Sequence, residues 1–167
     1  MISLILASIF TFKVIEVGLG IGTNTPIGNM ERFFSTGATG SIYLTKELGA
    51  NRISLDYEIS NLPSPNLPTY QLQLQRLSLE YGYSIYRHNR WSLPIYLGIS
   101  NVWLKRKQQT LTETGIVQAG DFGIGFHEDI SRANFGAKFF VSGLYYLGRK
   151  KTSAYIIGLK FNLGYEF

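Results

Sequence analysis

The segment with the clearest pattern in the chain is AYIIGLKFNLGYEF, residues 154–167. From its second residue to its last, every second residue is apolar or aromatic, and the residues between them are mostly small or polar. Side chains of a strand point alternately to opposite faces, so the segment predicts a strand with one continuous apolar face. A helix of the same residues would scatter Lys160, Asn162 and Glu166 around its circumference and would have no clean apolar stripe.

The bulk composition excludes several classes of protein. The chain has 167 residues, a length typical of one domain, of which 45% are hydrophobic and 16% charged. That charged share is low for a soluble domain, in which about a quarter of residues are charged. No window approaches the roughly 18–20 consecutive apolar residues of a membrane helix. High apolar content without long apolar runs favours a closed β-barrel, because lipid cannot satisfy open strand edges.

Charge, cysteine content and the N-terminus give further limits. The formal net charge is +5, but no long basic run or basic helical pattern indicates a nucleic-acid partner. Cysteine is absent, so there is no disulfide framework and no thiolate metal site, and we expect neither a metal nor a cofactor. Residues 1–12 have the apolar core of an export signal without its basic start or clear cleavage site. We interpret them as a truncated export signal or a strand extension, and residues 13–167 as a single barrel domain.

Eight segments have the alternation or composition of strands, separated by polar or proline-containing stretches. We predict strands at 14–23, 33–44, 52–60, 69–86, 91–103, around 122–126, 133–146 and 154–167. The predicted loops and turns are 24–32, 45–51, 61–68, 87–90, 104–116, 128–132 and 147–152. Within 69–86 the apolar phase changes near Gln75 and Arg76, which predicts a β-bulge there. No helical pattern interrupts the strands, so an antiparallel up-and-down meander is expected.

Glycine indicates which face of the sheet lies inside the barrel. Half of the 18 glycines fall on the polar parity of their strands. A narrow barrel crowds its concave side, where glycine fits, while the convex side has room for Leu, Trp and Tyr. The expected fold is therefore all-β, an eight-stranded antiparallel transmembrane β-barrel that is apolar outside and polar and glycine-rich inside. A soluble lipocalin-like ligand-binding barrel, the alternative, would require the aromatic residues to pack inside.

Two stretches resemble the small outer-membrane β-barrel family of OmpA-like and OmpX-like proteins. FNLGYEF at 161–167 is similar to the C-terminal signal read by the barrel-assembly machinery, with Phe161, Leu163, Tyr165 and Phe167 as its assembly residues. LSLEYGYSIYRHNRWSLPIYLGIS at 77–100 is similar to the strand, tight turn and strand of these barrels. The resemblance implies a bacterial outer-membrane location, periplasmic termini, and outer-membrane lipid, lipopolysaccharide and the assembly machinery as partners. The longer loops would then face outside.

The polar parity supplies candidates for a network inside the barrel: Glu16, Asp56, Glu58, Glu80, Lys138, Lys160 and Glu166. The lumen of an eight-stranded barrel is filled by side chains. Buried charges must be paired and hydrogen-bonded, so we expect a structural salt-bridge network. A proton or ion path through the same residues is the alternative.

Aromatic residues near strand ends predict two interfacial girdles. The candidates are Trp91, Trp103, Tyr155, Tyr165 and Phe167. The two tryptophans share one parity, and their separation is slightly more than the roughly 9–11 residues of a tilted strand that crosses hydrocarbon.

Two basic clusters fall on predicted outer loops. They are Lys105, Arg106, Lys107 and Arg149, Lys150, Lys151. Lysine and arginine at such positions are suited to the phosphates of lipopolysaccharide or to another anionic surface partner. Ordinary solvated loop charge is the simpler interpretation.

His127, Asp129 and Ser131 are the residue types of a hydrolase triad, and some outer-membrane barrels modify lipid A. Here the three lie at a predicted periplasmic turn, and spacing in sequence does not create the hydrogen bonds that a triad needs. We therefore expect a non-enzymatic structural or adhesive platform with a filled lumen. A lipid-modifying hydrolase, similar to a lipid-A deacylase, is the alternative.

Overall fold

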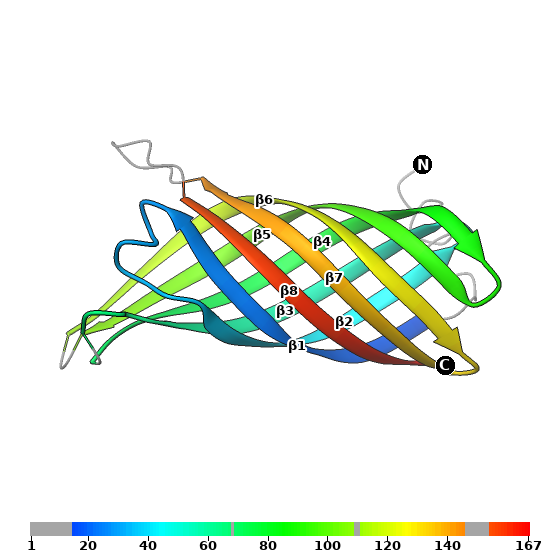
Figure 1. Ribbon diagram of the computed structural model, residues 1–167, viewed down its shortest axis with the longest axis horizontal. Coiled ribbons are helices and arrows are strands. Elements are labelled where there is room, and N and C mark those ends of the chain that lie inside the picture. Colours follow the sequence, from blue (N-terminus) through cyan, green and yellow to red (C-terminus); the bar gives the residue numbers. More distant parts are fainter. Residues whose placement is uncertain (1–14, 68, 109–110, 146–153) are drawn as a thin grey trace, which may run out of the picture.

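The computed structural model describes residues 15–67, 69–108, 111–145 and 154–167, in which eight antiparallel strands close into a barrel (Figure 1). The strands are β1 (Ile15–Gly28), β2 (Gly37–Leu48), β3 (Asn51–Pro63), β4 (Tyr70–His88), β5 (Trp91–Gln108), β6 (Leu111–Ile130), β7 (Ala133–Tyr145) and β8 (Ala154–Glu166). Each strand pairs with the next, and β8 pairs with β1 from Glu16↔Glu166 to Gly28↔Ala154. The predicted eight-stranded up-and-down barrel is confirmed.

Some predictions concern residues that the structure does not describe. The export signal or strand extension at 1–12 lies outside the described residues, and so does the loop at 147–152. Within the described ranges, no helix is both long and apolar enough to cross a membrane.

The apolar parity faces outward and the polar parity faces inward, as predicted. Leu159 and Leu163 are 42% and 63% exposed, whereas Lys160 is 1% exposed. Glycine is required on the concave side at Gly37, where an added Cβ would collide with the backbone carbonyl of Asn61. The lipocalin-like alternative is wrong, because the large apolar and aromatic side chains cover the outside of this barrel instead of packing within it.

Several strands continue into segments that the sequence predicts as loops or turns. β1 continues to Gly28 through most of the predicted loop 24–32. The predicted loop 104–116 is instead a paired hairpin, because β5 runs to Gln108 and β6 begins at Leu111. The predicted strand 33–44 is shifted, since β2 occupies Gly37–Leu48. In the β5–β6 hairpin the outward side chains are polar, such as Lys105 and Thr114, so the apolar-outside pattern ends although the backbone pairing continues.

The other ends of the hairpins are tight. Two-residue turns at Gly49–Ala50, Asn89–Arg90 and Ser131–Arg132 replace the longer turns predicted at 45–51, 87–90 and 128–132. Asn89 and Ser131 take left-handed backbone conformations with φ of 51° and 62°. We call this side of the barrel the turn end and the opposite side the loop end. The C-terminus lies at the turn end (Figure 1).

The bulge predicted near Gln75 and Arg76 is wrong. β3 and β4 pair in unbroken register from Asn51↔Tyr83 to Pro63↔Gln71. Inward-facing residues keep one parity along β4, since Leu72 is 5% exposed and Glu80 is also 5% exposed. The change in apolar phase reflects a change in the surroundings of the strand and not an extra residue.

The irregularity of β4 lies at its turn end. The register with β5 shifts between Ser84 and Tyr86, opposite Pro94. Proline has no backbone N–H to give to the ladder, and a bulge is a place where a strand tolerates it. The shift therefore accommodates Pro94, which lies on the inward parity of β5 and is fully buried.

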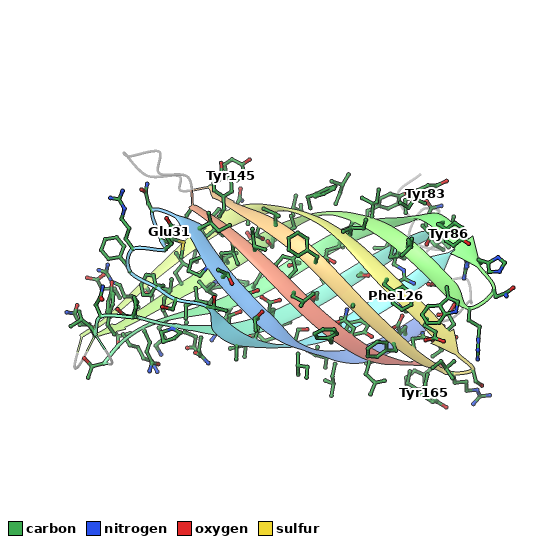
Figure 2. All side chains as sticks on the ribbon, in the orientation of Figure 1. Glu31, Tyr83, Tyr86, Phe126, Tyr145 and Tyr165 are labelled. Atoms are coloured by element: carbon green, nitrogen blue, oxygen red, sulfur yellow. The ribbon has the colours of Figure 1, made fainter. Side chains whose placement is uncertain are left out.

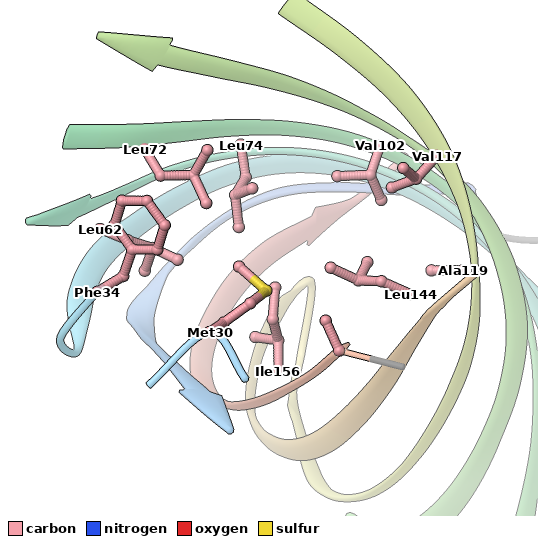
Figure 3. Close-up of a cluster of buried hydrophobic side chains, with 11 residues drawn as sticks. Met30, Phe34, Leu62, Leu72, Leu74, Val102, Val117, Ala119, Leu144 and Ile156 are labelled. Carbon is pink, nitrogen blue, oxygen red and sulfur yellow. The ribbon is translucent and has the colours of Figure 1, made fainter. Parts of the chain in front are cut away.

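Inward-facing residues at the loop end form a hydrophobic cluster, which we call the apolar plug (Figure 3). Its members are Met30, Phe34, Leu62, Leu72, Leu74, Val102, Val117, Ala119, Leu144, Ala154 and Ile156. Met30 and Phe34 come from the segment between β1 and β2, which folds over the mouth of the barrel. The Phe34 ring stacks on Tyr70 with centroids 5.2 Å apart. The plug closes this end, and polar side chains fill the lumen below it.

Candidate functional site

Two buried lysines tie opposite walls of the lumen together. The Nζ of Lys160, on β8, lies 2.5 Å from Asp56 Oδ2 and 2.7 Å from Glu58 Oε2, both on β3. The Nζ of Lys138, on β7, lies 2.5 Å from Glu80 on β4. All five residues are at most 6% exposed. These predicted lumen residues form ion pairs that span the barrel interior, which supports a structural role.

Arg76 and Asp121 belong to the same network, although sequence reasoning did not single them out. The Arg76 guanidinium donates to Glu58 Oε2 at 2.9 Å and to Ser142 Oγ at 2.9 Å. It also lies 3.6 Å from Asp121 Oδ1. The ring of Phe140 lies beneath the guanidinium carbon, 4.5 Å from it, as in a cation–π contact. Strict strand parity would have found both charged residues.

Glu16 and Glu166 lie nearer the turn end than the other predicted lumen residues. Glu16 is 2% exposed and accepts a hydrogen bond of 2.6 Å from the Tyr43 hydroxyl. Glu166 is half-buried and accepts a hydrogen bond of 2.9 Å from the Asn134 amide. Neither carboxylate forms an ion pair with a described residue, so both stand apart from the central network.

The described lumen has little free space. Below the apolar plug, a cavity of about 10 Å³ adjoins Arg76 and Leu144. Toward the turn end, a polar cavity of about 30 Å³ adjoins Arg52, Tyr96 and Lys138. A cavity needs roughly 10–15 Å³ to hold one water molecule, so the smaller space has room for about one water and the larger for two or three, too few for a file of waters through the barrel. This geometry favours the structural network over the ion-path alternative.

The structure does not assemble the three residues considered for hydrolysis. His127 faces the lumen, is 5% exposed, and places Nε2 2.8 Å from Asp129 Oδ1. Ser131 is exposed in the turn between β6 and β7, and no hydrogen bond joins it to either residue among those described. A serine nucleophile needs its base within hydrogen-bond reach. Among the described residues, no group of three or more acidic or histidine side chains is arranged to hold a metal ion.

The candidate girdle residues all project from the outer wall. Trp103 and Tyr155 lie toward the loop end, and Trp91, Tyr165 and Phe167 lie toward the turn end, with exposed fractions between 37% and 81%. Figure 2 shows Tyr145 and Tyr165 pointing outward near opposite ends of the barrel. The candidate assembly residues Phe161, Leu163, Tyr165 and Phe167 share this outward parity. Between the two groups of aromatics lies an apolar belt to which all eight strands contribute.

The first basic cluster lies on a strand and not in a loop. At the loop end β4, β5 and β6 extend past the belt as a projecting sheet of residues 70–75, 103–108 and 111–116 (Figure 1). Lys105 and Lys107 share the outward parity of β5. Arg106 has the opposite parity and forms an ion pair with Glu113. The second cluster, Arg149, Lys150 and Lys151, lies outside the described residues.

Comparison with known proteins identifies the fold. No family model and no curated protein sequence matches the chain. The solved structure of Neisserial surface protein A has a TM-score of 0.75 at 10% identity and covers 92% of this chain and 97% of its own. Ail, the attachment invasion locus protein of Yersinia pestis, has a TM-score of 0.60 at 12% identity, covering 91% and 98%. The N-terminal β-barrel domain of Pseudomonas aeruginosa OprF has a TM-score of 0.54 at 16% identity, covering 91% and 97%. The chain has the fold of these small outer-membrane β-barrels.

Proposed function

We propose that this protein is a bacterial outer-membrane β-barrel that serves as a non-enzymatic structural or adhesive platform. The observation that carries the proposal is the apolar belt, in which large side chains such as Leu19, Ile99 and Leu163 are 63–70% exposed. Apolar surface in water costs about 25 cal/mol per Å², whereas acyl chains accommodate it. Because the ladder is closed, no strand edge exposes unpaired backbone N–H and C=O groups to lipid, which could not hydrogen-bond them.

The arrangement of the two ends supports an orientation with periplasmic termini. Outer-membrane barrels have short turns on the periplasmic side and longer connections outside. Here the two-residue turns and the C-terminus share one end, and the projecting sheet is at the other. The filled lumen leaves the outer surface as the place for contact with partners. During insertion, the barrel-assembly machinery would recognise the outward residues of the last strand, Phe161, Leu163, Tyr165 and Phe167.

Cysteine labelling tests both location and orientation, because the natural chain contains no cysteine. Lys107→Cys places a thiol on the projecting sheet, and Arg90→Cys places one in a turn. After expression in Gram-negative cells behind an export signal, both variants should fractionate with the outer membrane. A membrane-impermeant maleimide should label Lys107→Cys on intact cells and Arg90→Cys only after permeabilisation. The reverse pattern, or recovery of soluble protein, would contradict the proposal.

Lipopolysaccharide is the partner that suits the outward face of the loop end. Lys105 and Lys107 lie on that face just beyond the belt. Neutralising Lys105, Arg106, Lys107, Arg149, Lys150 and Lys151 to glutamine should lower the amount of lipopolysaccharide that co-purifies with the barrel, because charge-assisted contacts to phosphate are lost. Neutralising Arg87 and Arg90 at the turn end is the control. Unchanged co-purification in the cluster variant would remove this partner.

A further inference from the structure

The outer wall carries a hollow where the apolar belt meets the projecting sheet. Its volume is about 420 Å³, and apolar side chains such as Leu79, Ile99 and Tyr145 line it. Gly120 also lines the hollow, and its cross-strand partner Gly143 shares the outward parity. Two neighbouring strands therefore lack a side chain at this place. The volume falls within the roughly 300–1,000 Å³ of small-molecule sites.

The barrel does not require glycine at these two positions. Neither has a left-handed backbone, and an added Cβ would lie 3.8 Å from the Tyr145 ring at Gly120 and 3.6 Å from the Tyr155 ring at Gly143. Those are ordinary contact distances, unlike the collision at Gly37 in the lumen. Glycine weakens a strand interior, and here it gains no packing in return. The structural result of the two glycines is the hollow itself.

Polar side chains stand at the rim of the hollow. Asn101 on β5 and Gln118 on β6 are cross-strand partners, and both are exposed on the outer wall. Each amide has donors and an acceptor. Their place at the outer limit of the belt is where the ester or amide linkages of a membrane lipid would lie.

Two cations lie above the rim on the same face. Lys105 and Lys107 form no ion pair with any described residue, whereas Arg106, on the other parity, is paired with Glu113. Lys105 is four residues beyond Asn101 on β5, about 13 Å along the strand at roughly 3.3 Å per residue. The outward cross-strand neighbours of the two lysines are glutamines and threonines, so no carboxylate competes for them.

From this arrangement we propose that the hollow binds one anionic, phosphate-bearing membrane lipid. Its acyl chain lies over Gly120, its linkage region lies beside Asn101 and Gln118, and its phosphate pairs with Lys105. The inference rests on the proposed function, because the hollow meets acyl chains only in a membrane-embedded barrel. A second copy of the chain is a poorer occupant, since a two-fold contact centred here would bring the same lysines together.

Trp103 is a reporter for this site, because it lies on β5 between Asn101 and Lys105. The chain has two tryptophans, so Trp91→Phe leaves Trp103 as the only tryptophan, whose fluorescence can be excited selectively over that of tyrosine. The Trp91→Phe protein is reconstituted in vesicles that mix phosphatidylcholine with phosphatidylglycerol, one of the two lipids being brominated on its acyl chains. Quenching of Trp103 then gives the ratio of the two lipid binding constants. We expect a preference of about threefold for the anionic lipid, the size of a partly exposed ion pair.

Two variants and one control separate the parts of the proposal. Lys105→Gln combined with Lys107→Gln should reduce the preference to about one, because the phosphate loses its partners. Gly120→Leu should also reduce it by filling the hollow. Lys46→Gln, an outward-facing lysine at the turn end, should leave the ratio unchanged. Electrophoresis in SDS verifies that each variant is folded, because a folded barrel that has not been heated migrates differently from the same protein after heating.

The possible results distinguish this inference from the proposed function. Equal binding constants in the parent protein, or an undiminished preference in the double lysine variant, would overturn the lipid site and leave the membrane barrel intact. A Gly120→Leu variant with altered oligomeric state and unaltered lipid preference would assign the hollow to a second copy. Failure of the folded parent to insert into vesicles would overturn the proposed function itself.

Discussion

Lys160 shows how a single charge is held inside this barrel. It is 1% exposed, and its ammonium lies between the carboxylates of Asp56 and Glu58. Moving an ion out of water costs several kcal/mol, and only well-placed opposite charges offset that cost. Because the carboxylates come from β3 and the lysine from β8, the compensation exists only when the barrel is closed. The charges of the lumen therefore depend on the native registers.

Replacing Lys160 by methionine should destabilise the barrel strongly. The change leaves Asp56 buried without a cation, and removal of one partner of a buried pair typically costs about 3–5 kcal/mol. Urea titration of the refolded protein in micelles would measure the loss of unfolding free energy. Lys46→Met, the same chemical change at a lysine that forms no ion pair with a described residue, is the control. Adding Asp56→Asn to Lys160→Met should recover part of the loss, and equal midpoints for Lys160→Met and Lys46→Met would argue against a structural network.

Strand parity predicts most of the central network and misses two of its members for identifiable reasons. The predicted bulge placed Arg76 at a break in the pattern, although it has the same inward parity as Glu80. Asp121 lies outside the predicted strand around 122–126, because the clear alternation of that segment begins only at Phe122. The predicted lumen residue Glu166 is half-buried and separate from the network, since its position at the end of β8 leaves it beside the turn end. Distances across the lumen depend on closure and cannot be read from one strand.

At the scale of the element, each long strand passes through two environments. In β4 the outward residues change from leucine and tyrosine below to Gln75, Gln73 and Gln71 above. The inward residues change in the opposite sense, from Glu80 to the plug residue Leu72. A β-bulge and a change of surroundings both shift the apolar phase by one residue, so sequence periodicity does not distinguish them. The unbroken register of β3 with β4 distinguishes the two cases and excludes a bulge near Gln75.

The same inversion explains why the sequence predicts loops where the structure has paired strands. Beyond the belt, polar residues face outward because water is there, and the apolar plug faces inward because it is the core. Lys105 and Lys107 are thus polar residues in a stretch whose composition predicts a loop, although they lie on a strand that pairs regularly with β4 and β6. Their fixed spacing is what places them above the rim of the hollow.

At the scale of the whole molecule, the side chains that fill the barrel change in character along its axis. The apolar plug lies at the loop end, the ion-pair network lies in the middle, and a small polar cavity lies toward the turn end. A belt of exposed apolar side chains surrounds the network and the polar cavity. The interior thus holds the barrel closed, and the outer wall and projecting sheet are left for contact with lipid and partners.

In a membrane-embedded barrel the apolar parity of the wall faces acyl chains, and site-directed spin labelling tests that orientation most directly. In the cysteine-free chain, labels at Leu159→Cys, Phe161→Cys and Leu163→Cys report on the outer face of β8, and Lys107→Cys reports on the water-exposed projecting sheet. In reconstituted vesicles, the three β8 labels should collide often with oxygen and rarely with a water-soluble nickel complex. The label at Lys107→Cys should show the opposite, with frequent collisions with the nickel complex and fewer with oxygen. Collision of the β8 labels with the nickel complex as frequent as that at Lys107→Cys would contradict the membrane-facing belt.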